Sequence, residues 1–182
     1  MACSSLIALP RVCGTDGVVG GIVELRMLAF ADLAPVTTGS TSLYTQATPG
    51  GIVSAIGLVA TKKFISIGIL KSTTGLEEVM TKDNQKGTLF FTQKLNLVLS
   101  GNTVLNQAFI QSVLNQPVAI IVKTRNGSYF VAGLNGQLEL DALTGGTGKT
   151  EADLSGWDLH FTGVSTAFAP MVEPSYVSTL FA

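Results

Sequence analysis

Hydrophobic and polar residues alternate over much of this chain, and a period of two is typical of half-buried β-strands. Residues 88–99 give the clearest example. One face of this run carries Leu89, Phe91, Gln93, Leu95, Leu97 and Leu99, and the other carries Thr92, Lys94 and Asn96. Phe90 and Val98 interrupt the polar face, so we expect that face to be partly covered as well.

Seven more runs rich in β-branched and aromatic residues predict further strands. These runs are residues 21–30, 52–59, 64–70, 118–123, 129–132, 137–140 and 157–161. Asn126-Gly127 lies between two of them, and this dipeptide tolerates the positive φ angles of a tight primed turn. A β-hairpin is therefore predicted around it.

A helical period replaces the alternation at residues 103–116. The positions that follow it are Val104, Leu105, Ala108, Phe109, Ser112 and Val113. Asn102 or Thr103 is placed to cap the first turn, and Pro117 ends the run. The pattern predicts one amphipathic α-helix between two strands.

Three segments have no clear period. Residues 33–51 and 72–87 are rich in polar residues, glycine or threonine and are expected to be long loops. Residues 164–182 carry Phe168, Met171, Tyr176, Leu180 and Phe181 without periodicity. We expect this apolar C-terminal arm either to dock on a neighbouring subunit or to pack on its own domain. The expected organisation is a single β domain over residues 1–163, followed by the arm over 164–182.

The composition points to a surface that is covered by other subunits. Of the 182 residues, 13% are charged, against roughly 25% in ordinary globular proteins, and 46% are hydrophobic. A large core is the alternative explanation. The net charge of −1 comes from scattered residues, which gives no basic footprint for nucleic-acid phosphates. Residues 50–60 are too few to span a membrane, and residues 1–10 lack the basic opening of a secretory signal.

Candidate catalytic or cofactor sites are sparse. Two cysteines and one histidine are too few for a structural zinc site. Residues 145–150 resemble a phosphate-binding loop, but Leu143 replaces its first glycine and no helix is predicted to follow. His160 has no nucleophile or orienting acid nearby in the sequence, and the carboxylate pairs Asp153/Asp158 and Glu77/Glu78 are better explained by solvation or capping. We expect no enzyme activity, no cofactor and no metal.

Mixed charge is concentrated in the predicted loop at residues 72–87. The charged residues are Glu77, Glu78, Lys82, Asp83 and Lys86. They form either a solvated hairpin tip or a set of inter-subunit contacts that fixes the register between stacked rings. Together with Phe168, Met171, Tyr176 and Phe181 of the arm, they are the candidate inter-subunit contacts.

Three stretches resemble the tail tube protein family, which comprises ring-forming tail and neck proteins of Bacteroidetes phages. They are residues 87–99, which run directly into the helix, the hairpin at 122–133 with its Asn-Gly turn and aromatic pair, and the strand, Gly/Thr-rich loop and strand at 140–162. The resemblance implies a β-sandwich or barrel-like domain with one flanking helix. It also implies rings, commonly hexameric, whose inner strands close a barrel around the channel for DNA.

The resulting expectation is a virion structural protein of the tail or neck, assembled in the host cytoplasm, with other tail or neck proteins as partners. DNA would pass through the lumen without sequence-specific binding, and no membrane is involved. Whether the chain is the repeating tube subunit or a connector ring stays open. A capsid decoration or other virion accessory protein is the alternative, and a hydrolase or nucleotide-binding enzyme is disfavoured by the missing motif elements.

Overall fold

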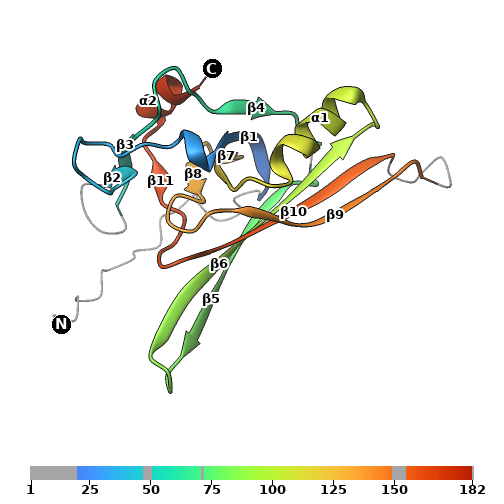
Figure 1. Ribbon diagram of the computed structural model, residues 1–182. Helices are drawn as coiled ribbons and strands as arrows, with labels where there is room; N and C mark the ends of the chain where they lie inside the picture. Colours follow the sequence, from blue (N-terminus) through green and yellow to red (C-terminus); the bar gives the residue numbers. More distant parts are fainter. Residues whose placement is uncertain (1–19, 47–50, 71, 149–154, 182) are drawn as a thin grey trace.

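The computed structural model describes residues 20–46, 51–70, 72–148 and 155–181, which form a mainly β fold of two open sheets (Figure 1). The first sheet has the order β2-β3-β11-β8-β7-β1-β4. Its strands are β1 (Ile22–Ala29), β2 (Tyr44–Gln46), β3 (Val53–Ile56), β4 (Ile65–Ile67), β7 (Val118–Thr124), β8 (Tyr129–Ala132) and β11 (Met171–Val172). The second sheet is fully antiparallel with the order β5-β6-β10-β9. Its strands are β5 (Gly75–Asp83), β6 (Thr88–Ser100), β9 (Glu139–Gly146) and β10 (Gly156–Ser165).

The main core lies between the two sheets. The four-stranded sheet contributes Leu95, Leu97, Leu159 and Phe161, and the seven-stranded sheet contributes Leu25, Met27, Ile120 and Val122. We call the face of the four-stranded sheet that carries these leucines its inward face, and the opposite face its outward face. The arrangement confirms a mainly β, sandwich-like fold, in which the sheets do not close into a barrel within one chain.

The flanking helix is confirmed as α1 (Val104–Val113). Thr103 is its N-cap, since its side-chain oxygen accepts a hydrogen bond from the backbone nitrogen of Asn106. Ile110 and Val113 are buried in the main core, so the helix covers part of the inward face of the four-stranded sheet.

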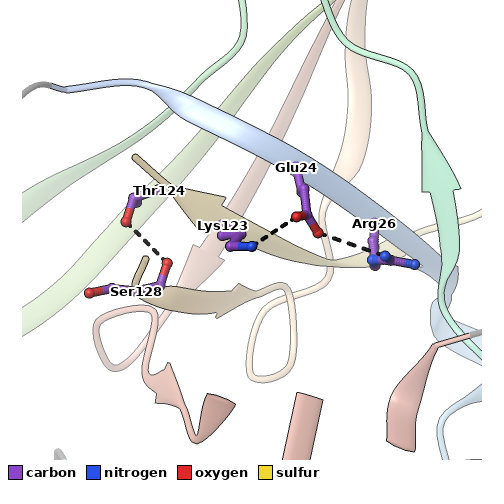
Figure 2. Close-up of polar contacts among 5 residues, drawn as sticks. All are labelled: Glu24, Arg26, Lys123, Thr124 and Ser128. Carbon is purple, nitrogen blue, oxygen red and sulfur yellow. Dashed lines mark hydrogen bonds and ion pairs between the residues drawn. The ribbon is translucent and has the colours of Figure 1, made fainter. Parts of the chain in front are cut away.

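The hairpin predicted at Asn126-Gly127 is also confirmed. It joins β7 to β8, but the turn is not of the expected primed type, because Gly127 has a positive φ of 86° and Asn126 does not. The hydroxyl of Thr124 donates to the carbonyl oxygen of Ser128 over 3.1 Å and helps to close the turn (Figure 2).

The C-terminal arm packs on its own domain. A second apolar cluster, which includes Leu28, Ile121 and Val131 of the seven-stranded sheet, is covered by residues of this arm. Those residues are Val172 of β11, Val177 of α2 (Pro174–Val177) and Leu180 of the short 3₁₀ helix Ser178–Leu180. The backbone nitrogen of Phe64 donates to the carbonyl oxygen of Leu180 over 2.9 Å. A second 3₁₀ helix, Phe30–Asp32, follows β1.

Tyr176 fastens the arm, and its replacement by phenylalanine is expected to cost about 1–2 kcal/mol of unfolding free energy. Its hydroxyl accepts a hydrogen bond from the backbone nitrogen of Ile56 (2.9 Å) and donates to the carbonyl oxygen of the same residue (3.1 Å). Chemical denaturation measures the loss. Tyr44→Phe is the control, because that hydroxyl accepts one bond from Asn135 at the surface, and a change above about 0.5 kcal/mol there would contradict the assignment.

Each of the eight predicted strands overlaps an observed strand, but the expectation of a loop over 72–87 is wrong. Most of this segment is β5, which pairs with β6 along its whole length and leaves residues 72–74 as a connection and residues 84–87 as a turn. Residues 33–51 contain the short strand β2 within an otherwise irregular connection, with residues 47–50 outside the described part. Gly145 and Gly146 of the loop predicted at 145–150 belong to β9, and residues 149–150 of that loop lie outside the described part.

Candidate assembly surfaces

The β5–β6 hairpin extends beyond the rest of its sheet (Figure 1). The last residue of β10, Ser165, pairs with Phe91 of β6, whereas β5 and β6 stay paired as far as Asp83 and Thr88. Residues 81–90 therefore form a two-stranded projection, which we call the hairpin arm. At its tip the carboxylate of Asp83 accepts hydrogen bonds from the backbone nitrogens of Gln85 (2.9 Å) and Lys86 (3.2 Å), which fixes the turn.

A buried polar network anchors the base of this hairpin. Gln93 of β6 is only 2% exposed. Its amide nitrogen donates to the carboxylate of Glu78 over 2.9 Å, and its amide oxygen accepts from the backbone nitrogen of Gly133 over 3.2 Å. The same oxygen of Glu78 accepts from the backbone nitrogen of Ala169 over 2.7 Å. The network joins β5 and β6 to the end of β8 and to the segment after β10.

The charged candidates occupy three different places. Glu77 lies on the outward face of β5, opposite Lys94, whereas Glu78 lies on the inward face and is hydrogen-bonded within its own chain. The hairpin arm carries Lys82, Asp83 and Lys86, and the ammonium of Lys86 lies 3.9 Å from the carboxylate of Asp83. The tip residues are available to a partner, and Glu78 has its role inside the protomer.

The apolar candidates also separate. Phe168 and Met171 are exposed, and the ring of Phe168 lies 4.2 Å from that of Phe91 between centroids. Tyr176 and Phe181 pack against the second cluster of their own domain. The guanidinium of Arg26 lies 3.6 Å above the centroid of the Phe181 ring, a cation–π geometry.

Arg26 belongs to a small charged row on β1 and β7 (Figure 2). Glu24 lies 2.9 Å from the ammonium of Lys123 and 3.7 Å from the guanidinium of Arg26. The hydrogen bond to Glu24, reinforced by Tyr129, raises the pKa of Lys123 above its ordinary value. The row places Arg26 under the end of the C-terminal arm. Sequence reasoning missed this row because the pairing of β1 with β7 is non-local.

The outward face of the four-stranded sheet is mostly polar and is interrupted by Val79, Phe90, Val98 and Val164. Lys94 and Asn96 of β6 stand beside Thr162 and His160 of β10. The imidazole of His160 lies 3.4 Å from the carboxylate of Asp158, so the expectation that this histidine has no acid nearby is wrong. Asp158 lies two positions earlier on the same face of β10. A shallow hollow of about 630 Å³ lies over these strands. Among the described residues, no group of three or more histidine, cysteine, aspartate or glutamate side chains could hold a metal ion. Within the same residues, no helix is long and apolar enough to cross a membrane.

Two features escaped the sequence reasoning. Met80, on the inward face of β5, is 56% exposed. On the same face, at the β9 side of the sheet, α1 leaves an apolar hollow of about 500 Å³. We call it the α1–β9 groove; it is lined by Val104, Ala108, Ile110, Leu114, Leu143 and Trp157, together with Gln107 and Gln111. The groove exists only because the helix docks on the sheet, so no local sequence pattern predicts it.

The outer strands β5 and β9 leave the four-stranded sheet with two free edges among the described residues, one of nine residues and one of eight. Long unpaired edges invite pairing with another chain. Comparison of the chain with protein-family models, curated proteins and solved structures gives no match in any of the three. The geometry of these surfaces is therefore the basis for a functional proposal.

Proposed function

We propose that the chain is a structural subunit that assembles with copies of itself into a closed ring, in which the β5 edge of one copy pairs with the β9 edge of the next. The wall of the ring is then a continuous barrel made of the four-stranded sheets. In view of the resemblance to tail tube proteins, we propose a tail or neck ring of a phage virion, with DNA passing through the lumen.

The strand directions support edge pairing. All three pairings in the four-stranded sheet are antiparallel, so β5 and β9 at its two edges run in opposite directions. A junction between β9 of one copy and β5 of the next is then antiparallel as well. The alternation of strand direction continues without a break around the ring.

The stagger of the two edges is the observation that carries the proposal. β5 lies opposite residues 88–96 of β6, whereas β9, across β10, lies at the level of residues 94–100. The middles of the two edges are thus offset by about five residues, or about 17 Å along the strands. Four strand spacings of about 4.8 Å amount to about 19 Å across the sheet. A ring built with this offset has strands tilted by about 40°, and offsets of four and six residues give about 35° and about 47°. These tilts lie in or just above the range of about 35–45° that closed barrels adopt.

The two faces of the sheet suit the two sides of a ring wall. The inward face is covered by the main core and by α1, so it belongs on the outside of the barrel. The outward face, which is mostly polar, then lines the lumen. Its charges are of both signs, among them Glu77, Lys94 and Asp158, which supports passage of DNA without tight or sequence-specific binding.

Proline substitutions in β5 test the edge pairing. Successive residues of an edge strand direct their N–H groups alternately toward the neighbouring strand and away from the sheet. Of Thr81→Pro and Lys82→Pro, one therefore removes an N–H that bonds to β6, and the other removes an N–H that points away from β6 at the free edge. We expect the variant that removes the free-edge N–H to keep its thermal unfolding midpoint. Its fraction of protein in rings is expected to fall at least about tenfold, measured by mass photometry and negative-stain microscopy.

Amide hydrogen exchange on monomeric protein identifies which of the two N–H groups lies at the free edge, since that amide is unprotected. The other proline variant is the matched control, in which the hairpin itself is weakened. Rings that persist in both variants would overturn edge pairing through β5. A wild-type chain that remains monomeric at all concentrations and attaches to capsid shells would instead favour an accessory virion protein.

A further inference from the structure

Met80 is an exposed apolar side chain on a free edge. It lies on the inward face of β5, opposite Phe91 of β6, and the described residues leave 56% of its surface exposed. Leu89 on the hairpin arm is exposed beside it on the same face. A methionine in this position is unbranched and adapts to irregular apolar hollows.

The α1–β9 groove is an unfilled apolar hollow at the opposite edge of the same sheet. Leu143 and Trp157 form its floor on the inward face, and Ala108 of α1 and Leu114 at the C-cap of that helix lie beside it. The absence of a side chain on Gly145 makes room for the indole of Trp157, since a Cβ there would lie 2.1 Å from the ring. The indole nitrogen of Trp157 is buried and has no hydrogen-bond partner among the described residues.

We propose that Met80 of one copy inserts into the α1–β9 groove of the next copy and sets the register of the junction. This inference rests on the proposed ring. In a continuous sheet the inward face stays on one side, so Met80 and the groove meet on the same side of the junction. Since a slip of one residue exchanges the faces, the stagger of about five residues must settle at an even number, four or six.

Both even staggers bring Met80 to the groove side of β9. Met80 faces Phe91, and a shift of six residues along β6 leads to Leu97, which is paired through Leu159 with Leu143. A shift of four leads to Leu95, which is paired through Phe161 with Leu140. Leu143 lines the groove itself, so the stagger of six places the methionine directly in it.

Charge substitutions on the two successive residues of β5 separate this contact from edge pairing in general. Met80→Glu is expected to reduce the fraction of protein in rings at least about tenfold at a concentration where the wild type is mostly assembled. Val79→Glu is the matched control: it is 41% exposed and adjacent, but it lies on the outward face. We expect that variant to assemble within about twofold of the wild type.

The groove is tested from its other side by Ala108→Glu, with Leu105→Glu as control. Leu105 is 81% exposed on the same helix but does not line the groove. We expect Ala108→Glu to reduce assembly and Leu105→Glu to leave it unchanged. The double variant Met80→Lys with Ala108→Glu is expected to recover rings, because the two opposite charges meet at the junction.

Photo-crosslinking locates the contact directly. Benzophenone-alanine at position 80 is expected to crosslink to residues 104–114 or 143 of another copy, as read by mass spectrometry of a mixture of isotope-labelled and unlabelled protein. Wild-type rings together with normal assembly of Met80→Glu would overturn this inference and leave the ring proposal intact. A wild type that never forms rings would overturn both.

Discussion

Replacing Phe161 by alanine is expected to lower the free energy of unfolding by about 3–5 kcal/mol. Phe161 is fully buried at the centre of the main core, and its neighbours on the adjacent strands are Leu95 and Leu140. The change removes the phenyl group and leaves a cavity between the two sheets. Each sheet is held by its own hydrogen bonds, so the sheets cannot move together to fill the cavity. For a domain of this length, we expect the unfolding midpoint to fall by about 6–20 °C.

Thermal and urea unfolding of Phe161→Ala and of Val164→Ala measure this effect. Val164 belongs to the same strand but is exposed on the outward face, so its truncation should change stability by less than about 0.5 kcal/mol. Equal losses in the two variants would mean that the two sheets do not enclose a common core.

Replacing Gln93 by leucine is expected to lower the free energy of unfolding by about 2–4 kcal/mol. Leucine fits the size of the buried site but offers no polar atom. The backbone N–H of Gly133 then loses its acceptor, and the carboxylate of Glu78 loses one of its two donors. Buried polar groups without partners are costly, so the loss exceeds the value of the bonds themselves.

Denaturation of Gln93→Leu, compared with Gln85→Leu at the exposed hairpin tip, gives the magnitude. Amide exchange gives the location: the amides of Gly133 and Ala169 should exchange faster in Gln93→Leu and stay protected in the control. If exchange accelerates only at the tip, the network does not anchor the hairpin.

The sequence predicts best what is decided locally. In β6 one face is apolar from Phe91 to Leu99 except at Gln93, because the core covers it, so the period of two is visible. The cap of α1 and the turn at Asn126-Gly127 depend on neighbouring residues alone. The cap and the position of the hairpin were therefore predictable without knowledge of the tertiary structure, whereas the predicted type of turn was wrong.

β5 was missed because little of the core covers it. Its inward residues alternate between apolar and charged, as Leu76, Glu78, Met80 and Lys82, and its outward residues are equally mixed. The arm at 164–181 was not predicted in detail for a different reason. Its contacts are single ones, such as Tyr176 with Ile56 and Arg26 with Phe181, and these follow no period.

The candidate interface was only partly visible in the sequence. The charges at Lys82, Asp83 and Lys86 do lie on a projecting surface, but Glu78 serves the protomer, because the backbone nitrogen of Ala169 reaches its carboxylate. Met80 and the α1–β9 groove depend on which face of β5 is inward and on where α1 docks. Neither is encoded within one segment.

The hairpin arm can change length without disturbing the rest of the protein. Beyond Phe91 its residues contribute no side chain to either apolar cluster, so insertions there leave the packing of the two sheets untouched. Because the side-chain period of a strand is two, such insertions keep the faces in place only when each strand gains an even number of residues. The hairpin arm is therefore a spacer whose length is adjustable in steps of about 7 Å.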